Sequence, residues 1–202
     1  MTVPGLTFLT IQNRLQGYLP EIHSCDGGSH HASVALILEP SEHGISIFFI
    51  ERAKRQGDPW SGQIAFPGGR REKQDADAQA VAERETLEEV GVQLTSDQCL
   101  GRLDDLQGRH GGTSAGMVIS CFVYSLDNQA SVEINNEVQA VARLPLAHLL
   151  EERNRTSVIY HQADKMKYPG IRFGENDSRI VWGLTYRFLC QFFTCMGHDL
   201  PE

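Results

Sequence analysis

Short, uninterrupted apolar runs separated by polar turns mark the first third of the chain. Residues 33–38 and 45–51 are apolar and β-branched, and the turn-like stretch 39–44 (EPSEHG) separates them. Runs of this kind, bounded by Pro and Gly, are typical of paired strands. A shorter run at 63–66 ends at 67–69 (PGG), which predicts a third strand that leads into a tight loop.

The stretch 77–90 carries the strongest helical signal. It has no Gly or Pro, Asp75 or Asp77 can cap its start, and Gly91 can close its end. Strands and helices interleave without a regular βαβ repeat. The pattern therefore predicts one α/β domain over residues 1–202, with a mixed β-sheet, a core at about 32–165 and terminal helices packed on it. The further predicted elements are helices at 5–19, 145–150 and 183–196, strands at 99–103, 117–126 and 137–144, and loops at 22–31 and 52–62.

Composition and charge narrow the class of protein. Of the 202 residues, 41% are hydrophobic and 22% charged, as in ordinary soluble globular proteins. The formal charge of −8 argues against sequence-independent binding to a nucleic-acid backbone, because such binding needs a basic surface. No apolar run approaches the ~20 residues of a membrane helix, and the N-terminus lacks the pattern of a secretory signal. The five cysteines include no C-x-x-C pair, so we expect free thiols and a cytoplasmic protein.

An acidic helical face is the main candidate for chemistry. Glu85, Glu88 and Glu89 stand at positions i, i+3 and i+4, while Leu87 and Val90 are expected to bury against the sheet. Like charges at this spacing repel, and the helix dipole disfavours anions near its C-terminus. A bound Mg2+ or Mn2+ ion would compensate both effects, since these ions prefer oxygen ligands. The alternative is a solvated acidic face without a metal ion.

The context of these glutamates resembles a known motif. Residues 69–75 (GRREKQD), eight further residues and 84–92 (RETLEEVGV) resemble the Nudix box, G-x5-E-x7-R-E-U-x-E-E-x-G-U, in which U is bulky and apolar. Asp75 stands in for the first Glu with one extra residue before Arg84, a departure that resembles the coenzyme A pyrophosphatase branch of the family. Similarity to that branch continues at 62–69 (GQIAFPGG), 136–138 (NEV), 144–146 (LPL) and 180–185 (IVWGLT). The branch's L-R-x-H element is replaced by 56–61 (QGDPWS).

The resemblance implies a Nudix-type α/β/α sandwich, a metal-dependent pyrophosphohydrolase activity and a small nucleotide substrate. It implies that Glu85 and Glu89 are the principal Mg2+ or Mn2+ ligands and that Glu88 is a further ligand or proton acceptor. The carbonyl of Gly69 is expected to be an additional ligand, and Arg84 is expected to orient the carboxylates. Dimers are common in the family, so a homodimer is compatible with the resemblance.

For several other residues, both a functional and a purely structural interpretation are open. Glu137 could supply a catalytic carboxylate or be an exposed residue beside a strand. Trp60 could stack on the substrate or cap a loop, and Arg52 and Arg55 could bind phosphates or be solvated. The main chain at Gly68 could approach the substrate closely, because glycine has no side chain.

Three functions remain open from the sequence. The first is a pyrophosphohydrolase with a coenzyme A-like substrate. The second is a broader enzyme for ADP-ribose, NDP-sugars or dinucleotides. The third is a nucleotide-sensing Nudix domain without turnover, which would be favoured by loss of a box glutamate; none is lost here.

Overall fold

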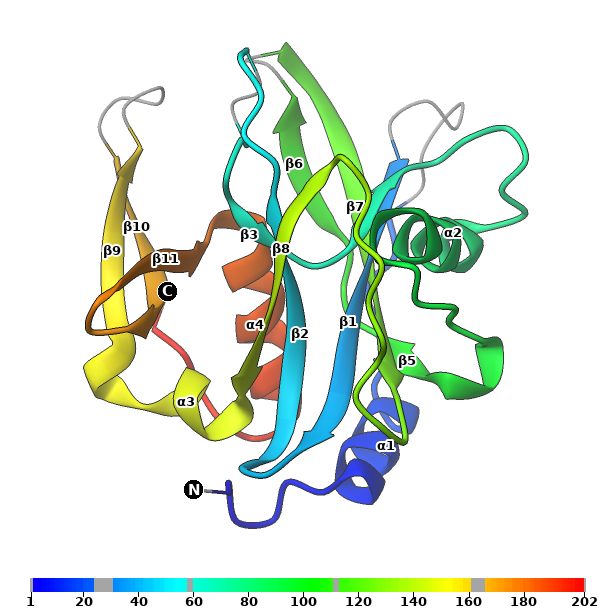
Figure 1. Ribbon diagram of the computed structural model, residues 1–202. Coiled ribbons are helices and arrows are strands. Elements are labelled where there is room, and N and C mark those ends of the chain that lie inside the picture. Colours follow the sequence, from blue (N-terminus) through cyan, green and yellow to red (C-terminus); the bar gives the residue numbers. More distant parts are fainter. Residues whose placement is uncertain (1, 24–30, 58–59, 111–112, 161–165, 202) are drawn as a thin grey trace.

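A mixed β-sheet forms the centre of the computed structural model, which describes residues 2–23, 31–57, 60–110, 113–160 and 166–201 (Figure 1). The strands are β1 (His31–Ser41), β2 (Gly44–Arg52), β3 (Ile64–Ala65), β4 (Gly68–Arg70), β5 (Cys99–Arg102), β6 (Leu106–His110), β7 (Thr113–Ser125), β8 (Val138–Pro145), β9 (Arg155–Tyr160), β10 (Met166–Gly174) and β11 (Asp177–Trp182). The helices are α1 (Phe8–Gln16), α2 (Ala78–Val90), α3 (Leu146–Leu150) and α4 (Gly183–Cys195), with short 3-10 turns at Ser96–Gln98 and Glu152–Asn154.

The main sheet has the strand order β3-β2-β1-β7-β5, and β4, β6 and β8 pair with β1, β7 and β2. The β1–β7 pair is parallel, whereas the other pairs are antiparallel, so the predicted mixed sheet is confirmed. The predicted pairing of the first two strands is also confirmed, with Ile37 opposite Phe48.

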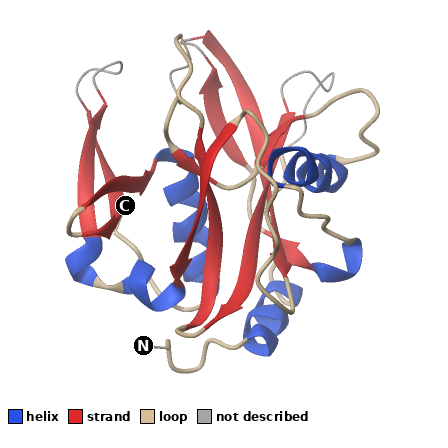
Figure 2. Ribbon diagram, in the orientation of Figure 1, coloured by secondary structure: helices blue, strands red, loops and turns tan. Residues whose placement is uncertain are grey.

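The central strands are apolar because both faces of the sheet are covered by helices (Figure 2). Alternate residues of β1 enter different cores: Leu36 and Leu38 pack with residues of α1 and α4, while Ala35 and Ile37 pack with residues of α2. This two-sided burial explains why β1 has an unbroken apolar run rather than an alternating one. None of the helices in the described part of the chain is long and apolar enough to cross a membrane.

The helix α2 begins and ends where the sequence predicts. The Asp77 side chain accepts a hydrogen bond from the Ala80 N–H at 2.9 Å, and Gly91 closes the helix in the left-handed conformation with φ 70°. The prediction that Leu87 is buried is wrong, because its side chain is 48% exposed. The buried residues are Val81, Ala82, Thr86, Glu89 and Val90. At about 100° per residue, a face centred on these positions turns Leu87 outward and turns Glu89 toward the sheet.

A second, three-stranded antiparallel sheet has the order β11-β10-β9 and is not predicted by the apolar pattern. Charged residues, glycines and Pro169 interrupt residues 155–182, so no apolar run marks these strands. The sheet packs on the main body through Ile171 and Val181, which join the core with α4. An edge-to-face contact between Phe49 and Phe173, with ring centroids 6.1 Å apart, adds to this packing.

Gly91→Ala should lower the free energy of unfolding by about 1–2 kcal/mol, because a side chain disfavours the left-handed conformation. An added Cβ would also lie 3.0 Å from the Cβ of Glu133. Urea unfolding measures the effect. The matched control is Gly17→Ala, since Gly17 has φ −87° and the nearest atoms to an added Cβ are 3.7 Å away. Equal stability of Gly91→Ala and the wild type would contradict the described helix end.

Candidate metal and catalytic site on helix α2

Three glutamates of α2, Glu85, Glu88 and Glu89, share one side of the helix but lie at different depths. Glu88 is the outermost, with 54% of its side chain exposed, and Glu85 is 15% exposed. Glu89 is 2% exposed and points toward the sheet. The acidic face is therefore not a uniformly solvated surface, because two of its three carboxylates are largely withdrawn from water.

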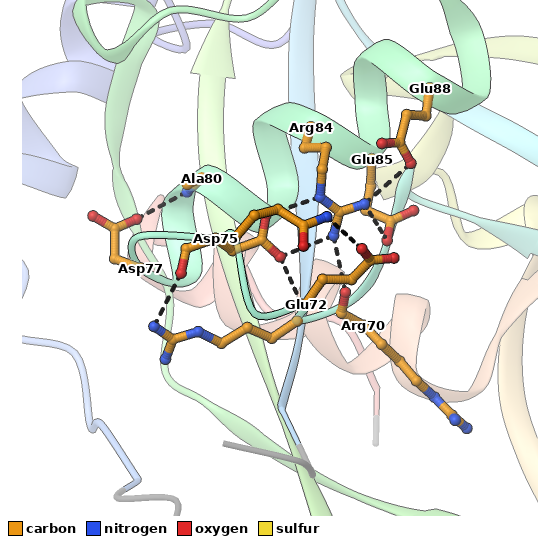
Figure 3. A network of polar contacts seen from close by, with 10 residues as sticks. Arg70, Glu72, Asp75, Asp77, Ala80, Arg84, Glu85 and Glu88 are labelled. Atoms are coloured by element: carbon orange, nitrogen blue, oxygen red, sulfur yellow. Dashed lines mark hydrogen bonds and ion pairs between the residues drawn. The ribbon is translucent and has the colours of Figure 1, made fainter. Parts of the chain in front are cut away.

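Arg84 connects these carboxylates to the loop that precedes the helix (Figure 3). Its Nε and Nη2 donate to the two carboxylate oxygens of Asp75 at 2.8 and 3.0 Å. Its Nη1 donates to Glu85 Oε1 and Glu88 Oε2, both at 3.0 Å, and its Nη2 also donates to the carbonyl of Arg70. The guanidinium is thus placed to orient two of the predicted ligands.

Asp75 is fixed from several directions although it is shorter than the Glu of the motif. It is buried, its Oδ2 accepts from the Glu72 N–H at 2.7 Å, and its carbonyl accepts from Arg71 Nη2 at 3.3 Å. The Arg84 guanidinium holds the pKa of the Asp75 carboxyl below its usual range. The loop with one extra residue therefore brings the shorter acid into a bidentate ion pair with Arg84.

Two glycines let the strand β4 lie directly against α2 and β1. The Gly68 N–H donates to Glu89 Oε2 at 2.9 Å. A Cβ on Gly68 would lie 2.2 Å from the carbonyl oxygen of Ser33, and a Cβ on Gly69 would lie 2.4 Å from the Glu85 carboxylate. Any side chain at these positions would displace β4 from the carboxylates. The Gly68 N–H is hydrogen-bonded to Glu89, and contact of the Gly68 main chain with substrate stays a prediction.

Burial raises the pKa values of the two inner carboxyls. Burial raises the pKa of Glu89 from 4.5 to about 8, and the hydrogen bond from Gly68 offsets only part of this effect. Burial also raises the pKa of Glu85, against the opposing effect of Arg84. The charges of Glu88 and Glu137 raise the pKa of Glu85 further, so these groups lie within electrostatic range of each other.

The residues present fit a divalent cation in their chemistry. Glu85, Glu88 and Glu89 offer hard oxygen donors, and the absence of a side chain at Gly69 leaves main chain in direct contact with Glu85. Within the described ranges, no three Asp, Glu, His or Cys side chains are already gathered as a closed metal cluster. Arg84 Nη1 contacts both Glu85 and Glu88 at 3.0 Å.

Glu137 and Arg55 form an ion pair, with Arg55 Nη1 3.0 Å from Glu137 Oε1 and both side chains about half exposed. The Arg55 N–H also donates to the Ser61 hydroxyl at 2.7 Å, which ties the two ends of the loop that contains Trp60. Arg52 ends β2, and its charge lowers the pKa of Glu89, so the two groups lie within electrostatic range of each other. These placements bring Glu137 and Arg52 to the carboxylates, while the roles of all four residues in binding or turnover stay predictions.

The apolar pattern gives no sign that residues 133–137, termed the 133–137 segment below, dock on the end of α2. The Asn135 N–H donates to the carbonyl of Glu89 at 3.0 Å, and the Glu133 N–H donates to the carbonyl of Val90 at 2.9 Å. These carbonyls lack partners within the helix itself. A usable signal is the Asn residue two positions before Glu137, since Asn side chains form such local turns.

Glu89→Gln should remove a pH dependence of stability in metal-free protein. The folded state keeps the Glu89 proton up to about pH 8, whereas the unfolded chain releases it near pH 4.5, so stability falls as the pH rises between these values. The amide can still accept from Gly68 but does not ionise. We expect the variant to be more stable than the wild type at about pH 8, by about 1 kcal/mol or more, with little difference near pH 5.

Urea unfolding in EDTA at both pH values measures this difference. Glu152→Gln, at an 86% exposed side chain, is the control and should show no such divergence from the wild type. An unchanged pH dependence in Glu89→Gln would show that the Glu89 carboxyl is not buried as described.

Comparison with known proteins agrees with this geometry. The chain is 30% identical over 154 residues to the mitochondrial coenzyme A diphosphatase NUDT8 of Homo sapiens, covering 75% of this chain and 64% of that protein. It is 35% identical over 129 residues to an uncharacterized protein of Schizosaccharomyces pombe, covering 61% of this chain and 39% of that protein. The chain thus matches less than two thirds of the length of either relative.

The structure is similar to the crystal structure of a MutT/nudix family protein from Enterococcus faecalis. The TM-score is 0.57 at 13% identity, and the match covers 95% of this chain and 70% of that one. This likeness shows the fold, a Nudix α/β/α sandwich. The family model for the NUDIX domain matches residues 29–162, well over half of the chain. The chain therefore belongs to the Nudix family, as its glutamate motif predicts.

Proposed function

We propose that the chain is a metal-dependent pyrophosphohydrolase that cleaves the pyrophosphate bond of a nucleoside diphosphate linked to another group. The observation that carries this proposal is the arrangement around Arg84. One guanidinium contacts Asp75, Glu85 and Glu88, while Gly68 and Gly69 bring β4 against Glu89 and Glu85. A sensing domain without turnover has no need of this complete set of carboxylates.

Each residue has a distinct task in this proposal. Glu85 and Glu89 hold a Mg2+ or Mn2+ ion, which supplies charge neutralisation of the pyrophosphate and lowers the pKa of a bound water. Arg84 keeps Glu85 and Glu88 oriented before the substrate arrives, so little reorganisation is needed during the reaction. Glu88 or Glu137 accepts the proton of the attacking water. Both are about half exposed, as a group that exchanges protons with solvent requires.

We propose a coenzyme A-like substrate. The relative NUDT8 is named a coenzyme A diphosphatase, and the resemblance to the coenzyme A branch extends beyond the glutamate motif. Arg55 pairs with Glu137, Arg52 lies within electrostatic range of Glu89, and in this proposal both would receive phosphate oxygens. Residues 56–61 replace the L-R-x-H element of the coenzyme A branch, so ADP-ribose, NDP-sugars and dinucleotides are tested as alternative substrates.

Metal removal should abolish turnover. EDTA should stop hydrolysis, and excess Mg2+ or Mn2+ should restore it, as measured by product analysis. Glu85→Gln and Glu89→Gln should each lower kcat by at least about 100-fold, or about 2.7 kcal/mol of barrier, without loss of folding. Glu152→Gln is the control and should keep wild-type kcat. Full activity of the wild type in metal-free buffer would refute the proposed chemistry.

Coenzyme A should be cleaved to 4′-phosphopantetheine and adenosine 3′,5′-bisphosphate, with kcat/KM above that for dephospho-coenzyme A. The 3′-phosphate distinguishes these two substrates, and a cation in the site should recognise it. Arg55→Gln should shrink the ratio of the two kcat/KM values, whereas Arg153→Gln, at a 74% exposed side chain, should leave it unchanged. If ADP-ribose or an NDP-sugar exceeds coenzyme A by tenfold in kcat/KM, about 1.4 kcal/mol, the coenzyme A proposal is wrong.

A further inference from the structure

The 133–137 segment directly precedes β8 in the chain and packs against the C-terminal end of α2. Its main chain binds the helix end at two points, from Glu133 to Val90 and from Asn135 to Glu89. The close approach depends on Gly91, because a Cβ there would lie 3.0 Å from the Cβ of Glu133 and 3.4 Å from its nitrogen. The segment is thus held against the same turn of α2 that carries Glu88 and Glu89.

Asn135 contacts both sides of this junction. Its main-chain N–H donates to the Glu89 carbonyl at 3.0 Å, while its side-chain Oδ1 accepts from the Glu137 N–H at 2.8 Å. Its own carbonyl accepts from the Val138 N–H at 3.4 Å. An Asn side chain that binds the main chain two residues later fixes a local turn, which Asp can also form but an alanine cannot.

We propose that Asn135 is a positioning residue that holds Glu137 at the carboxylate cluster of α2. This inference rests on the proposed function, since Glu137 must act in the site for its position to affect turnover. Asn135 itself touches neither substrate nor metal ion in this proposal; it acts through Glu137.

The other contacts of Glu137 come from the opposite side. The Ala53 N–H donates to the Glu137 carbonyl at 2.8 Å, and Arg55 holds its carboxylate. These contacts join Glu137 to the end of β2 and the following loop. Asn135 links Glu137 to α2 instead. Its side chain binds the Glu137 N–H, and its main-chain N–H binds the helix that carries Glu85 and Glu89.

Asn136 provides a matched control. It is the same residue type at the adjacent position, it is exposed, and its main-chain carbonyl accepts from Arg55 Nη2 at 3.3 Å. Asn136→Ala keeps that carbonyl. Asn135→Ala likewise keeps its main-chain bond to Glu89 but loses the acceptor for the Glu137 N–H. Asn135→Asp keeps an oxygen acceptor at the same place and should act as the conservative rescue.

The test compares Asn135→Ala, Asn135→Asp, Asn136→Ala, Glu137→Gln and the double variant Asn135→Ala/Glu137→Gln. Steady-state kcat and KM are measured with coenzyme A, or with ADP-ribose if the wild type cleaves that faster. The dissociation constant of Mn2+ is measured by calorimetry without substrate. Asn135→Ala should lower kcat by about tenfold with KM within about twofold, and should weaken Mn2+ binding by about threefold or more. Asn135→Asp and Asn136→Ala should stay within about threefold of wild-type kcat.

The double variant decides between positioning and an unrelated effect. If Asn135 acts through Glu137, the double variant matches Glu137→Gln in kcat and in Mn2+ binding. If the two losses multiply, or if Asn135→Ala equals Asn136→Ala, the inference is overturned. A Glu137→Gln variant with wild-type kcat and Mn2+ binding would instead remove Glu137 from the site, and the inference with it, while metal-dependent turnover would still stand. If the wild type cleaves neither compound, the proposed substrates fail and the Mn2+ comparison alone decides the role of Asn135.

Discussion

Crowding of negative charge on α2 is the constraint on which the site depends. When ionised, Glu85, Glu88 and Glu89 repel one another, and the first and last of them are mostly shielded from water. Burial of a charge without compensation is costly, and a raised pKa is the direct consequence. One guanidinium, that of Arg84, relieves the outer part of this charge through Glu85 and Glu88. Glu89 accepts a hydrogen bond from the Gly68 N–H, and burial raises its pKa to about 8.

In the proposed function, this imbalance would favour the binding of a divalent cation. A group that Arg84 and Gly68 stabilise only in part has more to gain from a divalent ion than a fully paired carboxylate would. The surrounding main chain is arranged accordingly. Glycines at positions 68, 69 and 91 allow β4 and the 133–137 segment to approach α2 from two directions, and a side chain at any of them would collide with a neighbour. The scaffold thus keeps the carboxylates close together and excludes most solvent from two of them.

The elements of the fold that could be predicted are those with a local signal. The helix α2 is marked by its capping residues Asp77 and Gly91, and the β1–β2 pair is marked by two apolar runs around a turn. The strands β9, β10 and β11 have no such signal, because their stability comes from packing on α4 and β2 rather than from their own pattern. Leu87 shows the same limit at a single position, since the sheet-facing side of α2 is set by tertiary contacts that helical spacing alone does not specify.

The residues of the candidate site likewise fall into a group with a local sequence signal and a group without one. Arg84, Glu85, Glu88 and Glu89 occupy two turns of one helix, so their relation follows from helical geometry and is readable from the sequence. The groups around them come from segments that are distant in the chain: Arg55 follows β2, and Asn135 and Glu137 precede β8. The pairing of β2 with β8 brings these segments together, with Arg52 opposite Val138. The residues of the proposed hydrolytic chemistry are therefore encoded locally, whereas the proposed substrate choice would depend on loops that the sheet assembles, which is where proteins that share one fold are free to differ.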